Sequence, residues 1–389
     1  MSRVEQGLHR ALDLLLHRRF PVAASSFSGS GVQRILVVRK DNIGDLLCTT
    51  PALRALRRAL PEAFLAVLVP AHCRPVVERN PDVDAIYTYT KAKHRSEGLG
   101  LPALWDLGRV LRALRARRFD LAIVMGRPCS RSAGWLAYAS GAPWRLGYRT
   151  DKLHPLGFFL NLAQDPGRMT SHEVDGCLEL LSAIGIPPAG RELTLIPDPE
   201  AQEAIRQRLA EERVEDAESV ALLHISSRRE TNRWPLAAFA QLADLLQDRL
   251  GLRIVLSWAP GDARNPLFPG DDDKAEEVAR LMRVRPILLR TPKLDDLIAT
   301  LSLSDFALSS DGGFMHIAAA LGIPQVALFG RAGATHWAPV STRCAVLQRD
   351  HDVDRIPVEE VLGAATAVIS RWVGGGEGSL QGSKRASPV

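Results

Sequence analysis

Cysteine is scarce in this sequence and widely spaced. Five cysteines are scattered over 389 residues, and no two of them form a close pair. Disulfide frameworks and cysteine-rich zinc sites need an even set or a regular close spacing, so this pattern argues against both and fits a reducing cytoplasm. The five are Cys48, Cys73, Cys129, Cys177 and Cys344.

Two other kinds of segment are also missing. No apolar run is long enough to span a bilayer, and the N-terminal residues lack the long apolar core and cleavage site of a signal peptide. No basic run carries interleaved aromatic residues, and the net charge of +5 is modest for this length, so we expect no nucleic-acid partner. Together these absences predict a cytoplasmic protein.

The composition that remains is that of a soluble globular protein, with 46% hydrophobic and 24% charged residues. Residues 34–39 form a buried-strand pattern, residues 40–45 a polar turn with a glycine, and residues 46–60 a helix pattern. The alternation continues through both halves and predicts an α/β, doubly wound fold. Further strands are expected at 64–69, 85–89, 121–125, 220–224, 253–257, 305–308, 325–330 and 345–347, and further helices at 74–79, 104–117, 173–184, 201–212, 235–250, 274–282 and 357–372.

A chain of this length is too long for one ordinary core, so we expect two domains that join at the proline-rich stretch beginning at Pro187. Residues 126–164 are less regular and rich in aromatic residues and arginine. Either they contribute to an acceptor site or they form a loose aromatic cover, and the sequence leaves both open. The expected parts are a helix and linker (1–33), two Rossmann-like domains (34–186 and 187–356), a C-terminal helix crossing back to the first domain (357–373) and a disordered tail (374–389).

Residues 4–20 carry leucines on a helical period, with arginines and a histidine among them. Such a segment can lie on an anionic membrane surface, or it can dock on its own protein or a partner. Peripheral contact with a membrane is therefore one of two expectations for this helix.

The densest stretch of readable chemistry is 309–324. Asp311-Gly312-Gly313 precedes a short helix that carries His316 in its first turn and is stopped by Gly322. The helix start directs unpaired N–H groups and a partial positive charge into the loop, which suits an anion such as a diphosphate. The alternative is that Asp311 is only a helix cap and His316 a partly buried polar residue.

Three loops are expected to face a cleft between the two domains. Residues 41–45 supply the carboxylate of Asp45, whereas residues 226–234 and the Asp311 loop supply hydroxyls, cations and a helix start. A carboxylate opposite an anion-binding loop suits group transfer from a diphosphate-activated donor. This inference requires that Asp45 and His316 face one shared groove.

Several motifs, taken together and in this order, resemble glycosyltransferase family 9, the ADP-heptose:lipopolysaccharide heptosyltransferases. The resemblance covers most of residues 34–370. The motifs are Ile43-Gly44-Asp45, Thr50-Pro51-Ala52-Leu53, Asn80-Pro81-Asp82-Val83-Asp84, Arg145-Leu146-Gly147-Tyr148, Trp234-Pro235 and Asp311-Gly312-Gly313-Phe314-Met315-His316.

The resemblance implies a GT-B fold and inverting, metal-independent transfer of heptose from ADP-heptose to a lipopolysaccharide core or related glycolipid acceptor. It implies no cofactor and a place at the cytoplasmic face of the inner membrane. Asp45 lies where the family has its general base, which must reach the acceptor hydroxyl. The alternative role of Asp45 is to cap the helix that follows it.

The resemblance also implies a donor-binding set in the second domain, with two departures. Gly312 replaces a residue that is more often Thr, and Asn232 lies where many members carry a lysine that neutralises the leaving diphosphate. Arg233, or Arg228 and Arg229, can substitute for that lysine. The full set is Ser226, Ser227, Arg233, Asp262, Asp311, Gly312, Gly313 and His316.

Residues 82–84 and 352–354 are Asp-x-Asp patterns and residues 271–273 an acidic cluster, but their polar surroundings favour solvated loops over a metal site. Two other functions remain as alternatives: a nucleotide-sugar epimerase, and a GT-B protein that binds a nucleotide sugar without catalysis. A dinucleotide oxidoreductase is disfavoured because the first turn lacks G-x-G-x-x-G.

Overall fold

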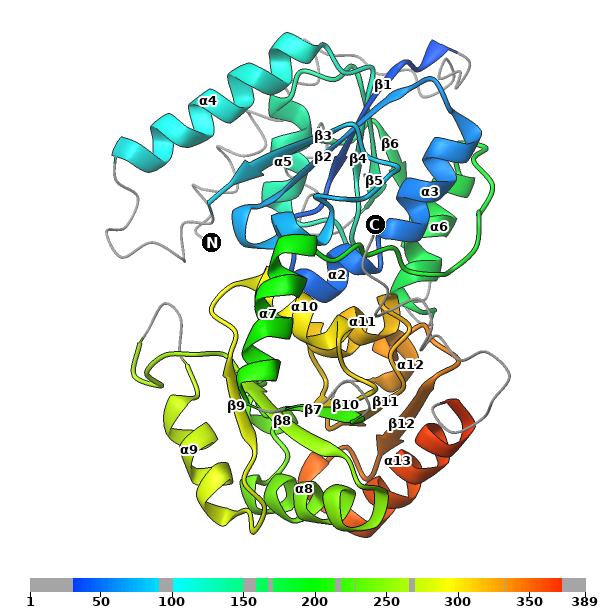
Figure 1. Ribbon diagram of the computed structural model, residues 1–389. Helices are drawn as coiled ribbons and strands as arrows, with labels where there is room; N and C mark the ends of the chain where they lie inside the picture. The colour runs from blue at the N-terminus through cyan, green and yellow to red at the C-terminus, as the bar shows by residue number, and fades with distance from the viewer. Residues whose placement is uncertain are drawn as a thin grey trace, which may run out of the picture. The chain divides into compact units, whose positions relative to one another are not determined.

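The computed structural model describes residues 31–90, 101–149, 159–166, 171–212, 214, 218–227, 229–265, 270–331 and 333–372. The chain divides into two compact units, Met1–Arg191 and Glu192–Val389 (Figure 1). The expected N-terminal helix at 4–20 and the expected disordered tail at 374–389 lie outside the described residues.

The first unit is built on a six-stranded parallel sheet in the order β3-β2-β1-β4-β5-β6. This is the strand order of a dinucleotide-fold domain, with β1 and β4 side by side at the centre. The expected strands are confirmed, and two more are present. The strands are β1 (Arg34–Val38), β2 (Phe64–Pro70), β3 (Ala85–Tyr89), β4 (Leu121–Val124), β5 (Trp144–Tyr148) and β6 (Leu162–Gln164).

Residues 126–164, expected to be less regular than the rest, contain helix α5 and strands β5 and β6. Arg145 interrupts the apolar pattern of β5, but its side chain is buried because backbone carbonyls satisfy it: Nε donates to the Phe159 oxygen at 2.8 Å and Nη1 to the Ala142 oxygen at 2.7 Å. Because these carbonyls lie outside the strand, the sequence of β5 alone does not show that an arginine can be buried in it. Burial lowers the pKa of Arg145 from its ordinary value.

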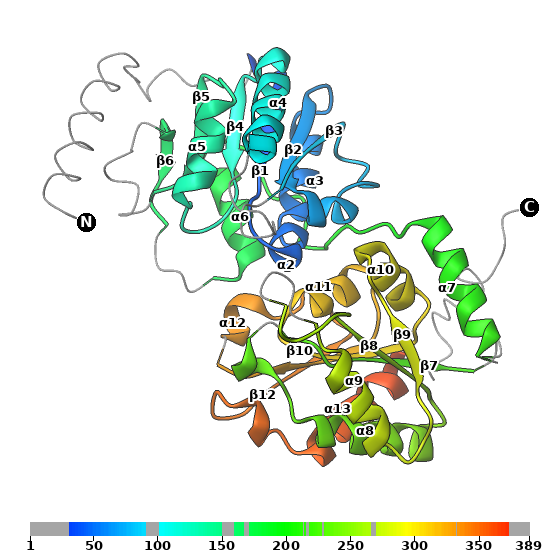
Figure 2. The ribbon, with the colours of Figure 1, turned by 90° about the vertical axis from the view of Figure 1, so that its left-hand side faces the viewer.

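Helices cover both faces of this sheet (Figure 2). Leu36 and Val38 pack in one cluster with residues of α4 and α5, and the alternating residues Ile35 and Val37 point to the opposite face. On that face α3 and α6 pack against each other. The helices are α2 (Ile43–Leu47), α3 (Thr50–Ala59), the 3₁₀ helix η3 (Ala71–Val76), α4 (Leu101–Arg117), α5 (Arg131–Ala139) and α6 (Glu173–Ser182).

Two expected helices of the first unit differ from the structure because of proline. The single helix expected at 46–60 is two, α2 and α3, since Pro51 lacks the N–H that would continue the ladder and starts the second helix instead. The helix expected at 74–79 is the 3₁₀ helix η3, which contains Pro75.

The second unit repeats the architecture, with a parallel sheet in the order β12-β11-β10-β7-β8-β9. Counted from β7, this is the same order as in the first unit, and β7 and β10 are the central pair. Strand β9, which the sequence analysis missed, forms one edge. The strands are β7 (Val220–His224), β8 (Arg253–Trp258), β9 (Ile287–Arg290), β10 (Phe306–Ser310), β11 (Gln325–Phe329) and β12 (Cys344–Gln348).

The last helix, α13, packs on α8 and on strands β11 and β12. The indole of Trp234 joins this layer by donating to the Ile356 oxygen at 3.0 Å. The expected crossing of the C-terminal helix onto the first domain stays a prediction. Helices of this unit are α7 (Pro199–Glu211), η6 (Glu230–Asn232), α8 (Leu236–Leu250), α9 (Asp272–Leu281), α10 (Leu294–Ser302), α11 (Gly313–Ala320), α12 (Ala334–Trp337), η7 (Val353–Arg355) and α13 (Val358–Trp372).

The central strand β10 should be the most sensitive part of the second unit. Leu308 on β10 is fully buried, so Leu308→Ala leaves a cavity and is expected to lower the free energy of unfolding by about 2–5 kcal/mol. Val346 on the edge strand β12 is 37% exposed, and Val346→Ala should cost less than about 1 kcal/mol. Urea denaturation of the two variants measures the difference, and equal costs would contradict the assigned strand order.

Candidate functional site

The loops that follow the central strands are the natural place for a site in each unit. In an open parallel sheet, neighbouring strands whose connections run in opposite directions leave a crevice at their carboxyl ends. That point lies between β1 and β4 in the first unit and between β7 and β10 in the second. The sequence-predicted residues Asp45, Ser227 and Asp311 all follow these strands.

In the first unit, a buried guanidinium organises the end of β1. Arg39 is 2% exposed. Its Nη2 donates to Asp45 Oδ1 at 3.1 Å and to Glu173 Oε1 at 2.7 Å, and its Nε lies 3.3 Å from Asp41 Oδ2. Burial alone lowers the pKa of Arg39, but the surrounding carboxylates outweigh it and raise the pKa well above its ordinary value. Arg39 therefore carries a permanent positive charge.

Asp45 lies in the first turn of α2, and each of its two carboxylate oxygens accepts a hydrogen bond from a different partner. Oδ1 accepts from Arg39, and Oδ2 accepts from the backbone N–H of Asn42 at 3.0 Å. The cap role considered for Asp45 is thus present in the structure. A carboxylate has about four lone-pair positions, and the side chain is 17% exposed, so it can also accept a proton from a ligand.

The loop after β4 closes over the same cluster. Gly126 has a φ of 123°, and a Cβ there would lie 3.2 Å from Asp41 Oδ2, so the backbone approaches the carboxylate closely. The next residue, Arg127, donates to Ser171 Oγ at 2.8 Å and to Glu179 Oε2 at 3.2 Å.

In the second unit, hydrogen bonds join the loops after β7 and β10. Asn232 is buried, and its Nδ2 donates to Asp311 Oδ2 at 2.8 Å, while Ser227 Oγ donates to the Asp311 oxygen at 3.4 Å. Burial raises the pKa of Asp311, and the charge of Arg229 and the hydrogen bond from Asn232 act in the opposite direction. The departure from lysine at 232 therefore places an amide against this carboxylate.

The remaining predicted residues of the β7 loop divide between two roles. Arg233 Nε donates to the Ser227 oxygen at 2.9 Å, and its Nη1 lies 3.8 Å from Glu230 Oε1, with the side chain 29% exposed. Ser226 Oγ instead donates to Asp271 Oδ2 at 2.6 Å and accepts from Ala259 N at 2.9 Å, so it links this loop to the end of β8. Arg228 lies outside the described residues.

Helix α11 begins at Gly313. Gly312 precedes it in an extended conformation with φ of 172°, and a Cβ there would meet only the Ser310 oxygen at 3.8 Å. The backbone thus has room for a threonine at 312. His316 is buried at 2% exposure, with its ring edge-on to Trp337 at 6.4 Å.

Asp262 lies apart from this group, in the loop after β8, and pairs with its neighbour Arg264. Hydrogen bonds from the Arg264 side chain and backbone lower the pKa of Asp262 to about 2. The acidic cluster corrects one expectation. Asp271 is 6% exposed and bonded to Ser226 and Lys274, so it is not a solvated loop residue.

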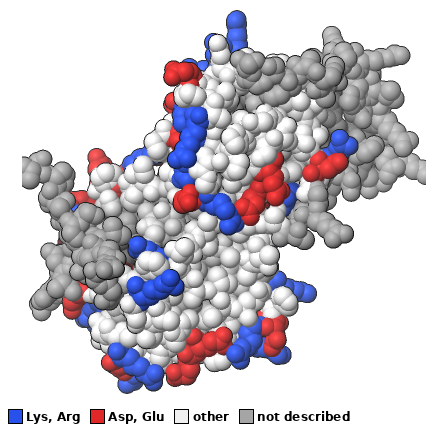
Figure 3. All heavy atoms as spheres, turned by 90° about the vertical axis from the view of Figure 1, so that its right-hand side faces the viewer, with Lys and Arg blue, Asp and Glu red and all other residues white. Residues whose placement is uncertain are grey.

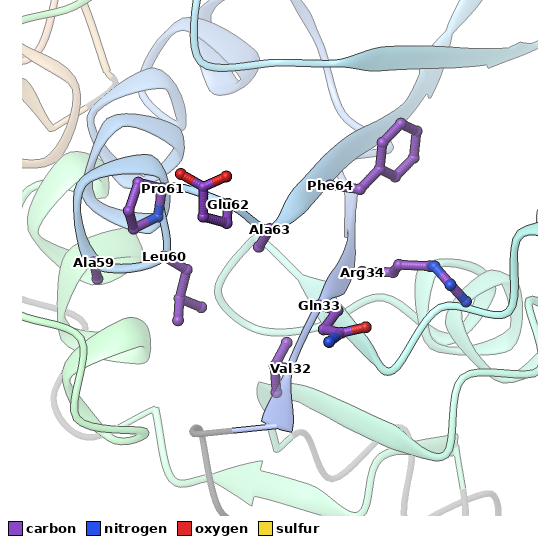
Figure 4. A pocket seen from close by; sticks show the side chains of 9 residues that line it. All are labelled: Val32, Gln33, Arg34, Ala59, Leu60, Pro61, Glu62, Ala63 and Phe64. Carbon is purple, nitrogen blue, oxygen red and sulfur yellow. The ribbon is translucent and has the colours of Figure 1, made fainter.

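Within the described ranges, no group of three or more His, Cys, Asp or Glu side chains is arranged to hold a metal ion. A cavity of about 440 Å³ lies elsewhere, at the amino ends of β1 and β2, and is lined by Arg34, Leu60 and Phe64 among others (Figure 4). Because the crevice of a parallel sheet is at the carboxyl ends of its strands, this cavity is not the candidate site.

Residues 107–355 match the family model "Glycosyltransferase family 9 (heptosyltransferase)". The chain belongs to this family. It is therefore a glycosyltransferase, and the family inferred from its motifs is confirmed.

Curated relatives agree with this assignment, and solved structures share the fold. The chain is 25% identical over 329 residues to lipopolysaccharide heptosyltransferase 2 of Escherichia coli K12, covering 81% of this chain and 88% of that protein. A family 9 glycosyltransferase of Veillonella parvula aligns with a TM-score of 0.76 at 23% identity, over 87% of this chain and 97% of that one. The E. coli ADP-heptose lps heptosyltransferase II aligns with a TM-score of 0.69 at 21% identity, over 87% and 99%. The GT-B type of fold, with two Rossmann-like domains, is confirmed.

Two features bear on surfaces rather than on the site. In the described part of the chain, no helix combines the length and apolar character needed to cross a membrane. On the face shown in Figure 3, basic and acidic side chains of the described residues are interspersed, without a broad patch of one sign.

Sequence reasoning missed three residues of these networks: Arg39, Glu173 and His224. Glu173 has no local signal, because its partner Arg39 lies 134 positions away. His224 does have a local signal, because it is a polar residue at the end of an apolar strand. Its ring stacks on Phe314 of α11 at 4.7 Å, and its Nδ1 lies 3.0 Å from Ser257 Oγ.

His224 should make the stability of the protein depend on pH. Burial lowers its pKa from 6.5 to about 4, although Asp271 acts in the opposite direction. Below pH 6.5 the imidazole of His224 is protonated in the unfolded chain but stays neutral in the folded protein until about pH 4. The free energy of unfolding therefore falls as the pH drops from 6.5 towards 4, by at most about 3 kcal/mol.

Urea denaturation of His224→Gln across this pH range tests the assignment. The variant should lose less stability than the wild type between these two pH values, because glutamine does not titrate. The same loss in both proteins would show that other groups cause it.

Proposed function

We propose that this enzyme transfers a heptose from ADP-heptose to a lipopolysaccharide core or related glycan acceptor, with inversion at the anomeric carbon and without a required metal ion. Family membership supports heptosyl transfer. The observation that carries the reaction is the presence of a partly exposed carboxylate, Asp45, at the central crevice of one unit and an anion-binding helix start at that of the other.

Asp45 is the proposed general base. Inversion requires one displacement, in which the acceptor hydroxyl attacks the anomeric carbon from the face opposite the leaving diphosphate. A carboxylate within hydrogen-bond reach takes the hydroxyl proton as the new bond forms. The two fixed partners of Asp45 orient its oxygens and leave lone pairs for this proton.

The second unit is proposed to hold the donor. The N–H groups at the start of α11 are proposed to bind the diphosphate, with His316 in the first turn of that helix. The Ser227 hydroxyl, which donates to the Asp311 oxygen, is the proposed neighbour of the diphosphate. Arg233 and Arg229 are the proposed cations for the leaving diphosphate, in place of a lysine at 232. Ser226 and Asp262 support the neighbouring loops, and Asp262 has a second role only if a ligand displaces Arg264.

The acceptor determines the proposed location. A lipopolysaccharide core precursor is anchored in the inner membrane, so the enzyme would work at the cytoplasmic face of that membrane, with peripheral contact at most. Residues 4–20 stay the proposed contact, and they lie outside the described residues.

A protein that binds a nucleotide sugar without transferring it is the second candidate. The observation in its favour is Asn232, whose uncharged amide contacts Asp311 where many family members have a cation. Such a protein would bind the donor and turn over none of a broad acceptor panel.

Incubation of the protein with ADP-heptose and truncated core lipid A acceptors tests the proposed reaction. We expect transfer that continues in the presence of a metal chelator, and a product of inverted anomeric configuration by NMR. A strict requirement for added divalent metal would contradict the mechanism, and donor binding in calorimetry without any transfer would favour the second candidate.

The variant Asp45→Asn tests the base. It keeps the size of the side chain but cannot accept the proton, so kcat should fall by at least about 100-fold with little change in the donor dissociation constant. Asp175→Asn is the matched control, because Asp175 is also a first-turn helix carboxylate of this unit but pairs with Arg191 instead. Near-wild-type turnover by Asp45→Asn would remove Asp45 from the reaction.

A further inference from the structure

One nitrogen of Arg39 serves two carboxylates at once. Nη2 donates to Asp45 Oδ1 at 3.1 Å and to Glu173 Oε1 at 2.7 Å. Asp45 is partly exposed, whereas Glu173 is buried at 3% exposure. The shorter bond therefore goes to the carboxylate that cannot reach a ligand.

The position of Arg39 is fixed from several directions. It extends from the end of β1, Asp45 comes from α2, and Glu173 comes from the first turn of α6. Asp41 lies against its Nε at 3.3 Å, and Cys177 of α6 lies 3.9 Å from its Nη1. Because its side chain is only 2% exposed, the guanidinium is closely packed and has little room to take another position.

A helix cap does not need this arrangement. The Asn42 N–H satisfies the cap through Asp45 Oδ2, whereas Arg39 engages the other oxygen. Burying a guanidinium is costly unless it is fully paired, and removal of one partner of a buried pair is strongly destabilising. A cluster of one cation and two further carboxyl groups beside a partly exposed carboxylate is thus better explained by what it does to that carboxylate.

We propose that Arg39 and Glu173 are a positioning pair for Asp45, in which Arg39 orients the base and Glu173 offsets the charge of Arg39. This inference rests on the proposed function, because it takes Asp45 as the base. Alone, a buried cation at 3.1 Å would hold Asp45 in place but would weaken it as a base. With Glu173 as a second partner, the guanidinium orients Asp45 without keeping it from accepting a proton.

Other titratable groups face this cluster and must be considered. Asp41 is the third carboxylate on Arg39, and Cys48 and Cys177 lie beside it. Burial, the largest cause, raises the pKa of the Cys177 thiol to about 12, so it stays neutral at working pH. Tyr89 and Cys129 adjoin Asp41, and burial raises the pKa of each, to the extent that both are neutral as well. Among these groups, the charges that vary are therefore those of the three carboxyl groups.

The proposal predicts opposite effects of two variants on the acid limb of the pH profile of kcat/KM. Glu173→Gln leaves the cation less compensated, which favours the charged carboxylate, so the limb should move to lower pH by about one unit. Arg39→Gln leaves carboxyl groups together without a cation, so the limb should move to higher pH by about one unit or more. Both variants should lower kcat more than they raise KM.

An ion pair near the amino ends of β2 and β3 is the control, because it lies away from the carboxyl ends of the central strands. Arg57 Nη2 donates to Asp84 Oδ2 at 2.7 Å, and Asp84 also accepts from Leu65 N at 2.7 Å. Arg57→Gln and Asp84→Asn remove a more exposed ion pair of the same unit and should lower stability without moving the acid limb. ADP binding by calorimetry should be unchanged in all four variants.

If Arg39→Gln does not fold, Arg39→Lys replaces it. Lysine keeps the charge but cannot bond two carboxylates in one plane, so the limb should stay near that of the wild type while kcat falls several-fold. Glu173→Gln and Arg39→Lys together then test whether Arg39 and Glu173 position Asp45.

The outcomes separate this inference from the proposed function. If Asp45→Asn abolishes turnover but Glu173→Gln and Arg39→Gln leave the limb in place, or move it in the same direction, the positioning pair is wrong and the base stands. If Asp45→Asn keeps turnover, the base itself is wrong. Opposite movements of the limb, with the Arg57 and Asp84 variants unchanged, would confirm the inference.

Discussion

The order of strands in each sheet is the constraint on which the candidate site depends. Each unit brings its first and fourth strands together at the centre, so the loops that follow them must meet. In the first unit this brings Arg39 and Asp41, after β1, beside Gly126, after β4. In the second it brings Ser227 and Asn232 beside Asp311. Polar residues that are far apart in sequence thereby become neighbours at the carboxyl ends of the central strands.

Buried polar networks then give these loops a defined shape. Asn232, Ser227 and Asp271 are all below 9% exposed, and each has a hydrogen-bond partner in a neighbouring loop. An unpaired buried group costs about 1–3 kcal/mol, so each bond holds a loop in one conformation. Gly330 supports the same arrangement, since a Cβ there would lie 2.5 Å from the Thr231 oxygen.

The sequence predicted much of this, and the parts that it missed share a cause. Strand–helix alternation predicted both domains, and the position of Gly322, with φ of 68°, marks the end of α11 as expected. Strand β5 and the partner Glu173 were missed because each depends on contacts distant in the chain: carbonyls around Arg145 in one case, Arg39 in the other. The roles of Asp45 and of the donor loop stay predictions.

A crystal structure with a non-transferable ADP-heptose analogue and an acceptor tests the central claim most directly. We expect the diphosphate at the start of α11, beside Ser227 and Arg233, and the attacking hydroxyl about 3 Å from the Asp45 carboxylate. A diphosphate bound away from these loops, or Asp45 on an outer surface far from the reacting sugar, would contradict it.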